Sequence, residues 1–325
     1  MNSSRLMQLV VGDVPIALPV YFPSISSIKT AMLPLEYLKF LASASCINNK
    51  LLVSAFDLAK INDKSEVNKI LKKACDSGVT VLFDSGNYES FWMGAQKEWT
   101  QKKFHDVLGC YECHLAFGFD EQDPPQDLNE HLDLIVKNYE ADVAATSAII
   151  IPIVHGSRSD IPRLCSSVVN STHCQAIAVP ERKLGDGLLQ RAETVRDIRQ
   201  ALSEGGHDVA LHLLGTGNPI SMAVYAVMGA DSFDGLEWCQ TVVDHDTGLL
   251  YHLSQADFFA EQTKWGATDL SFHARTLAHN LEFYTEWMGR LRRGFAQDNV
   301  RDFLKFNIPQ RALYKLEGLE GWPAP

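Results

Sequence analysis

The stretch Leu211–Gly235, LHLLGTGNPISMAVYAVMGADSFDG, contains one complete strand–helix–strand unit. The apolar run that ends at Leu214 lies between glycine breaks, which is typical of a short buried strand. A helix is expected over Ile220–Met228, and the chain then enters a second strand that carries Asp231 and Asp234. In parallel α/β folds the chemistry sits at the carboxyl ends of the strands. The unit therefore places two carboxylates where a site is expected, although both could equally be turn or cap residues.

Similar units repeat along the chain, because apolar runs alternate with amphipathic stretches. The strand candidates are residues 51–56, 79–83, 114–120, 148–154, 174–179 and 209–214. This alternation predicts an α/β fold, a (β/α)8 TIM barrel formed by a single domain over residues 1–325. We expect an N-terminal hairpin over residues 8–22 and C-terminal helices over 265–293 and 298–306 packed on the barrel. A doubly wound sheet is the competing fold, but neither GxGxxG nor GxxxxGKS follows the first strands.

Composition limits the classes of partner. The 325-residue chain has a formal net charge of −11, which argues against a broad basic surface for a phosphate backbone but leaves a local basic patch open. No run of ~18 uncharged apolar residues is present, so no membrane partner is expected. Seven cysteines at irregular spacing, without a signal-peptide pattern, indicate reduced thiols and a cytoplasmic location. The lone CxxC motif at 110–113 is weak evidence for zinc or redox chemistry.

Four aspartates stand at the ends of predicted strands: Asp84, Asp120, Asp231 and Asp234. Two carboxylates in one pocket suit acid–base chemistry, or a nucleophile paired with an acid at a sugar anomeric carbon. A carboxylate nucleophile would form a covalent glycosyl intermediate while its neighbour moves a proton. The alternative is that some of these aspartates only stabilise turns. His155 also follows a strand, as a ligand, a hydrogen-bond donor to a base or a structural histidine.

Eight short motifs, in the same order along the chain, resemble those of the tRNA-guanine transglycosylases, the (β/α)8 enzymes that exchange a guanine for a 7-deazaguanine. The motifs are LPVYFPS at 18–24, FDSGNY at 83–88, AFGFDE at 116–121, IVHG at 153–156, AIAVPE at 176–181, HLLGTGNP at 212–219, GADSFD at 229–234 and LAHNLEFY at 277–284. The fifth is the loosest match. No single motif is specific, and their common order carries the resemblance, which extends from Leu18 to about Phe303.

The resemblance implies catalytic roles for two of the carboxylates. Asp234 would be the nucleophile that binds C1′ of the ribose, and Asp84 would be the general acid and base for the departing and entering bases. Asp231 would be a supporting carboxylate. Burial and a neighbouring aspartate would keep one carboxyl protonated near neutral pH. No cofactor is implied.

The resemblance also implies a set of contacts to the base. Ser85 and Asp120 would hydrogen-bond the purine edge, and Tyr88 and Leu214 would stack on its two faces. Val179 and Pro180 would supply the backbone wall that reads the 7-substituent, and because Pro180 lacks an N–H this wall would read that group differently. The full substrate-binding set is Ser85, Gly86 (which lets the loop approach the ring), Tyr88, Asp120, His155 (where the family commonly has glutamine), Gly156, Val179, Pro180, Leu214 and Gly215.

The zinc subdomain of the family is absent or reduced in this sequence. The family has a CxCxxC cluster before the histidine that corresponds to His279. In this chain, Cys239 is the only cysteine in residues 235–278. One histidine cannot hold a structural zinc, so we expect a zinc-less branch with no metal site. Because that subdomain helps the family to dock tRNA and to dimerise, both a homodimer and the need for a partner protein stay open.

The first functional hypothesis is a pentosyltransferase that replaces guanine with a 7-deazaguanine such as preQ0, in tRNA or DNA, through a covalent Asp234–ribose intermediate. The alternatives are a nucleosidase or base-exchange enzyme for free nucleosides, and a non-catalytic subunit of a transglycosylase complex. The presence of both Asp84 and Asp234 argues against a non-catalytic subunit. Basic residues clustered near the pocket would favour a nucleic acid, and dispersed ones free nucleosides. These are Arg158, Arg163, Arg182, Lys183, Arg290, Arg292 and Arg293.

Overall fold

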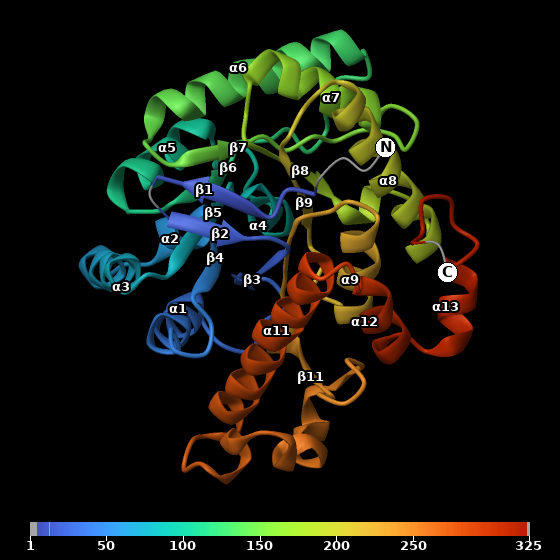
Figure 1. Cartoon of the computed structure of the whole chain (residues 1–325). Helices are drawn as coiled ribbons and strands as arrows, with labels where there is room; N and C mark the ends of the chain where they lie inside the picture. The colour runs from blue at the N-terminus through green and yellow to red at the C-terminus, as the bar shows by residue number, and fades with distance from the viewer. Residues whose placement is uncertain (1–4, 13, 324–325) are drawn as a thin grey trace.

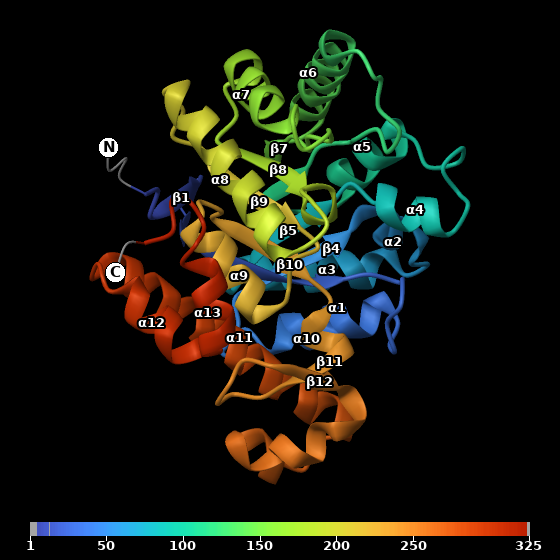
Figure 2. The same cartoon turned by 90° about the vertical axis from the view of Figure 1, so that its right-hand side faces the viewer.

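The computed structural model describes residues 5–12 and 14–323. Eight parallel strands form one nearly closed barrel with helices around it, which is a (β/α)8 TIM barrel (Figures 1 and 2). The strands are β3 (Val20–Ile25), β4 (Lys50–Ser54), β5 (Thr80–Asp84), β6 (Leu115–Phe117), β7 (Ile149–Ile151), β8 (Ala176–Pro180), β9 (Ala210–Leu214) and β10 (Ser232–Gly235). Their order is β7-β6-β5-β4-β3-β10-β9-β8. A parallel bridge between Ile153 and Ala178 joins the two ends of this order.

An N-terminal hairpin covers the amino end of the barrel. Its strands, β1 (Gln8–Val11) and β2 (Val14–Ala17), pair antiparallel. The hairpin is shorter than the predicted 8–22, because residues 20–22 belong to the barrel strand β3, which pairs with β10. Ile16 of the hairpin packs with Phe22 and Leu82, which belong to the inner layer of barrel side chains. Because successive side chains of a strand face opposite sides, the intervening residues of the same strands pack outward on the helices. The barrel is thus filled at this end, and a ligand site is expected at the carboxyl ends of the strands.

Helices follow the strands and surround the barrel (Figure 2). Asp63, Asp127 and Asn218 accept hydrogen bonds from first-turn N–H groups of α3, α6 and α9, so the sequence itself defines where these helices begin. The helices are α1 (Pro34–Ser43), α2 (Ala55–Lys60), α3 (Lys64–Asp76), α4 (Asn87–Trp92), α5 (Gln101–Cys110), α6 (Leu128–Ala145), α7 (Ile161–Thr172), α8 (Leu188–Glu204), α9 (Pro219–Val227) and α10 (Glu237–Gln240). No described helix combines the length and apolar character needed to cross a bilayer.

The chain after α10 forms a small hairpin region and three C-terminal helices. The elements are β11 (Thr241–Val243), β12 (Leu250–His252), the 3-10 helices η2 (Leu253–Gln262) and η3 (Lys264–Ala267), α11 (Phe272–Ala296), α12 (Val300–Asn307) and α13 (Gln310–Leu316). The sequence predicted a helix from residue 265, but the helix begins at Phe272. The reason is a cap, since the Ser271 hydroxyl accepts the Ala274 N–H. Figure 1 shows α11 lying across the side of the barrel.

Asp231 lies away from the cavity at the carboxyl end, so the expectation that it supports Asp234 is wrong. It precedes β10 at the amino end of the barrel, and three residues of strand span about 10 Å. Its buried carboxylate lies 2.5 Å from Arg199 and 3.2 Å from Arg5, and it accepts the Leu211 N–H at 3.0 Å. Asp231 therefore ties β9, β10, α8 and the N-terminal segment together.

Replacing Asp231 with asparagine is expected to destabilise the fold. Because Asp231 is 2% exposed, the substitution leaves two guanidinium groups without a buried counter-charge, which costs about 3 kcal/mol. Urea unfolding measures this loss of the free energy of unfolding. Glu320→Gln is the matched control, because Glu320 also pairs with an arginine, Arg196, but its side chain is 89% exposed. Equal midpoints for the two variants would contradict the structural role of Asp231.

Candidate active site

A cavity of about 400 Å³ opens at the carboxyl end of the barrel, which is within the range of small-molecule sites. Nine of the twelve residues predicted from the sequence line it, and these are Asp84, Ser85, Tyr88, Asp120, His155, Pro180, Leu214, Gly215 and Asp234. They follow six different strands, so only closure of the barrel brings them together. Ser24, Lys29, Glu89, Glu181 and Glu237 also line the cavity and were not predicted.

The three other predicted residues, Gly86, Gly156 and Val179, do not line the cavity. Gly86 has a φ of 83°, and a Cβ there would lie 2.5 Å from Cβ of Phe56. The glycine is therefore required by the turn and by the neighbouring chain rather than by a bound ring. Val179 is fully buried and packs in the outer layer between strands and helices. Its side chain faces outward because its neighbours on β8 face inward.

Three donors fix the Asp234 carboxylate near the end of β10. Oδ1 accepts hydrogen bonds from the Gly215 N–H at 2.9 Å and from Nε2 of His212 at 3.1 Å. Oδ2 accepts one hydrogen bond, from the Ser24 hydroxyl at 2.8 Å. A carboxylate oxygen has about two lone-pair sites, so Oδ2 retains one for a ligand. The side chain is thus held in one orientation with a free acceptor position.

His212 belongs to the site although the sequence did not single it out. It lies inside β9, buried, with its ring 4.7 Å from that of Phe117. The 2.7 Å contact between its Nδ1 and the Ser232 hydroxyl fits the tautomer that carries the proton on Nε2, facing Asp234. In the sequence, a histidine within an apolar run is equally consistent with a structural core residue and with a residue of the site. Only the structure shows that the His212 side chain faces the inside of the barrel, where Asp234 lies.

Asp84 ends β5 and accepts the Gly86 N–H at 3.0 Å. Burial raises the pKa of Asp84 well above its usual range, and the charge of Glu89, followed by those of Asp120 and Asp234, raises it further. The cavity therefore favours the protonated form of Asp84 more than water would.

Glu89, on α4, is a second proton-binding carboxyl beside Asp84. Its oxygens accept hydrogen bonds from the hydroxyls of Ser26 at 2.5 Å and Ser54 at 2.8 Å. Burial, with the charge of Asp57 as the next cause, raises the pKa of Glu89 to about 7. The position directly after Tyr88 was the only sequence signal for this residue, because its burial depends on the packing of α4.

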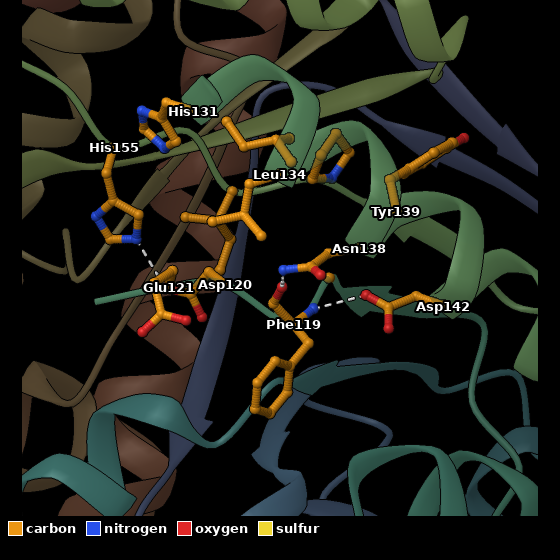
Figure 3. A pocket seen from close by; sticks show the side chains of 13 residues that line it. Phe119, Asp120, Glu121, His131, Leu134, Asn138, Tyr139, Asp142 and His155 are labelled. Atoms are coloured by element: carbon orange, nitrogen blue, oxygen red, sulfur yellow. Dashed lines mark hydrogen bonds and ion pairs between the residues drawn. The ribbon is translucent and has the colours of Figure 1, made fainter. Parts of the chain in front are cut away.

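Asp120 is held in the charged state. Burial alone would raise its pKa, but hydrogen bonds from His155 at 2.7 Å, Asn87 at 2.9 Å and Ser85 at 3.0 Å outweigh it and lower the pKa of Asp120. Figure 3 shows the His155 ring pointing at this carboxylate. Gln122 donates a fourth bond, at 2.5 Å. A ligand that donates to Asp120 therefore has to displace one of these donors.

A second hollow, of about 20 Å³, lies behind Asp120 and His155 against α6 (Figure 3). Asn138 donates to the Phe119 carbonyl at 3.2 Å, and the Asp142 carboxylate accepts the Phe119 N–H at 2.7 Å. A space of this size holds about one water molecule. These contacts therefore support the loop that carries Asp120 and do not form a separate ligand site.

Two further carboxylates stand near the opening of the cavity. Glu181, the first residue of η1 (Glu181–Lys183), accepts hydrogen bonds from Arg191 at 2.7 Å and Tyr225 at 2.6 Å. Glu237 begins α10, where burial, and next the charge of Asp234, raises its pKa to about 7. Altogether six acidic and two basic side chains line the cavity. This excess of acidic over basic side chains does not attract phosphate groups into the cavity.

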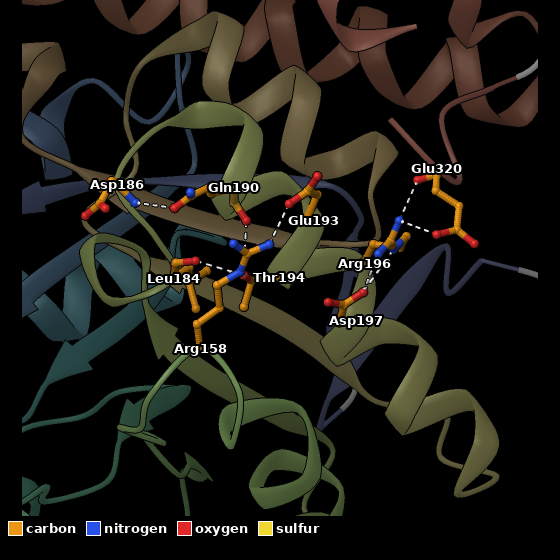
Figure 4. Close-up of polar contacts among 9 residues, drawn as sticks. All are labelled: Arg158, Leu184, Asp186, Gln190, Glu193, Thr194, Arg196, Asp197 and Glu320. Atoms are coloured by element: carbon orange, nitrogen blue, oxygen red, sulfur yellow. Dashed lines mark hydrogen bonds and ion pairs between the residues drawn. The ribbon is translucent and has the colours of Figure 1, made fainter. Parts of the chain in front are cut away.

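The basic residues considered in the sequence are dispersed around the barrel. Figure 4 shows Arg158 engaged by Glu193 and Thr194, at 2.5 Å and 3.0 Å. Arg290 donates to Asn307 between α11 and α12, and Arg292 donates to the Pro19 carbonyl at the start of β3. Of the seven, Arg182 is the one that lines the cavity. This dispersal argues against a long basic track for a polynucleotide.

His279, which the sequence compared with a zinc ligand, is engaged in hydrogen bonds. Both ring nitrogens of His279 are engaged, Nε2 with the Val243 carbonyl at 2.8 Å and Nδ1 with the Thr263 hydroxyl at 3.2 Å. The Cys239 thiol contacts the Leu236 carbonyl instead of facing His279. Within residues 5–12 and 14–323, no three His, Cys, Asp or Glu side chains are grouped to hold a metal ion.

In comparison with known proteins, the chain matches no protein-family model and no curated relative. Residues from separate motifs, such as Asp84, Asp120 and Asp234, nevertheless line one cavity.

Proposed function

We propose that this protein is a base-exchange transglycosylase, the activity of the family that its motifs resemble. It would replace guanine with a 7-deazaguanine such as preQ0 at a ribosyl unit of a nucleic acid. The observation that carries the proposal is the pair Asp84 and Asp234 in one cavity. Three donors orient Asp234, while burial, with the charge of Glu89 as the next cause, raises the pKa of Asp84. Unlike environments of this kind divide two carboxyls into an acid and a nucleophile.

The first half of the proposed reaction releases guanine. Oδ2 of Asp234 attacks C1′ of the ribose, and the C1′–N9 bond breaks as the ester bond forms. The electron pair of the broken bond leaves with the base, and Asp84 transfers its proton to that base. In the second half Asp84 takes a proton from the incoming base. The nitrogen of that base then attacks C1′ and releases the Asp234 carboxylate, so protons and electrons balance over the cycle.

Asp120 would recognise the base. Its charged oxygens can accept from the N–H groups of a guanine or 7-deazaguanine edge once Gln122 or Ser85 moves away. Tyr88 and Leu214 line the same cavity and would contact the ring faces. Pro180 offers no N–H to the 7-substituent, which favours a substituent that does not need a donor from that position.

The alternative substrate is a free nucleoside. The dispersed arginines and the acidic lining favour it, because neither would hold a long phosphate backbone. Both substrates use the same carboxylates and the same covalent intermediate. They differ only in what extends from the ribose beyond the cavity.

Denaturing mass spectrometry tests the proposal. Wild-type protein is incubated with preQ0 and, in separate mixtures, with bulk tRNA, duplex DNA, single-stranded DNA or guanosine. We expect an added mass of the ribosyl unit and whatever is attached to it in at least one mixture. An adduct with guanosine alone would select the free-nucleoside alternative. If folded protein forms no adduct in any mixture, the proposed nucleophile is wrong.

His212→Phe is expected to slow formation of this adduct. The phenyl ring keeps the packing against Phe117 but removes the donor to Asp234. A hydrogen bond to a charged group contributes about 1.5–3 kcal/mol, so we expect a loss of about 10- to 100-fold in rate. Rapid-quench single-turnover kinetics measures it, with thermal unfolding as the check on folding. A rate equal to wild type would show that Ser24 and Gly215 orient the carboxylate without His212.

A further inference from the structure

Two aromatic rings, Tyr88 and Trp92, and two cations, Lys29 and Arg182, form the rim of the cavity, with one cation over each ring. Trp92, at the end of α4, is 52% exposed, and the Lys29 ammonium lies 5.1 Å from the centre of its ring. Tyr88 packs edge-on against Trp92 at 6.3 Å, and the Arg182 guanidinium lies 5.8 Å from the Tyr88 ring. These side chains come from the segments after β3, β5 and β8, so they bracket the opening from different sides.

The two cations have no acidic partner among residues 5–12 and 14–323. This distinguishes Lys29 and Arg182 from Arg158, Arg191 and Arg196, whose charges are neutralised by glutamates or aspartates. In a chain of net charge −11, two unpaired cations at the opening of an acidic cavity form a local site for an anion that stays outside. A phosphate attached to a ribose in the cavity has this placement.

The backbone holds Lys29 in this position. Its φ is 57°, in the left-handed region that non-glycine residues rarely adopt, and Gln240 donates to its carbonyl at 2.9 Å. Backbone of this kind persists where the surrounding structure imposes it, and it is common at binding sites. The loop therefore fixes the backbone of Lys29 at a place from which its ammonium group reaches the Trp92 ring.

We infer that this rim binds the nucleotide next to the one whose base enters the cavity. The neighbouring base would stack on Trp92, and the phosphates on either side of the reacting ribose would contact Lys29 and Arg182. The inference rests on the proposed function and narrows its substrate to a single-stranded polynucleotide recognised over a short segment. A short segment needs only two phosphate contacts and no long basic surface. A polynucleotide substrate is therefore compatible with the dispersed arginines.

Fluorescence anisotropy tests the rim with a labelled single-stranded pentanucleotide that has a central guanosine, in RNA and DNA forms. For two phosphate contacts on a single strand, log K should fall with log salt with a slope of about −1.4, and Arg182→Gln or Lys29→Asn should reduce the slope by about 0.7 each. Asparagine suits position 29 because it tolerates positive φ. Trp92→Ala should weaken binding about 10-fold.

Two matched variants serve as controls. Lys264→Gln removes another cation that lies over an aromatic ring, 4.7 Å from Trp265, and Phe258→Ala removes a ring that is 80% exposed in η2. Neither residue lines the cavity, so both variants should bind the pentanucleotide like wild type. The rim is refuted if the pentanucleotide binds no more tightly than guanosine, if the rim variants behave like these controls, or if the slope indicates six or more contacts.

The same experiment separates failure of the rim from failure of the proposed function. Affinity is measured without preQ0, so it does not depend on chemistry. Tight, rim-dependent binding without any Asp234 adduct would support the rim and overturn the transglycosylase. An adduct with guanosine, combined with no preference for the pentanucleotide, would support the chemistry and overturn the rim.

Discussion

Asp234→Asn is expected to abolish the covalent adduct and to lower base exchange by at least about 10⁴-fold, the scale of losses seen when an enzymatic nucleophile is removed. The amide oxygen cannot form the glycosyl ester, whereas it can still accept hydrogen bonds from His212 and Gly215. The amide nitrogen would face the Ser24 hydroxyl, which can act as its acceptor. The substitution therefore removes the nucleophile with little change in the surrounding hydrogen bonds.

The diagnostic comparison for Asp234→Asn is between chemistry and binding. Dissociation constants for preQ0 and guanine, measured by calorimetry, should stay within a few-fold of wild type, because the base contacts belong to other residues. Single-turnover exchange of labelled guanine should be undetectable. A variant that exchanges guanine at the wild-type rate would exclude Asp234 as the nucleophile. Loss of both binding and exchange, with an altered thermal unfolding midpoint, would instead indicate damage to the fold.

Asp84→Asn is expected to slow guanine release by about 10²- to 10⁴-fold, the usual contribution of a general acid. Asparagine can still accept the Gly86 N–H but has no proton to give to the departing base. The adduct at Asp234 should therefore form slowly rather than not at all. This partial loss distinguishes the acid from the nucleophile.

The pH dependence provides a second test of Asp84. Burial raises its pKa, followed by the charge of Glu89, so the proton-bearing form dominates below that raised pKa and is lost as the pH increases through it. Wild-type kcat/KM for guanine release should fall on the alkaline side, and Asp84→Asn should lose this limb. Because the pKa of Glu89 is itself about 7, the limb reports the pair rather than one residue. An alkaline limb that persists in Asp84→Asn would assign it to another group.

Local patterns in the sequence were sufficient to predict the barrel. The segment around Leu214 shows why, because an apolar run between glycines, followed by an amphipathic stretch, defines a strand and a helix from neighbouring residues alone. The repetition of this unit then leaves few arrangements other than a parallel barrel. The carboxyl-end positions of Asp84, Asp120 and Asp234 follow directly, since each closes a predicted strand.

The exact ends of the helices and the contacts of individual side chains depend on tertiary interactions, which the hydrophobic pattern of the sequence does not show. The helix expected from residue 265 starts at Phe272 because Ser271 provides the cap. The expectation for Asp231 was wrong because periodicity shows which face of a strand a residue occupies but not which charged groups its side chain contacts. Those groups are Arg5 and Arg199, and both are distant from Asp231 in the sequence.

By itself, the sequence determined the order of strands and helices and the carboxylates at the strand ends, because hydrophobic period and glycine breaks act over a few neighbouring residues. Only the tertiary structure decided which groups act on those carboxylates. Ser24 and His212 reach Asp234 because β3, β9 and β10 are adjacent in the closed barrel. Burial, which raises the pKa of Asp84, is likewise a property of the assembled barrel, since the interaction of a charge with its surroundings depends on distance in space and not along the chain.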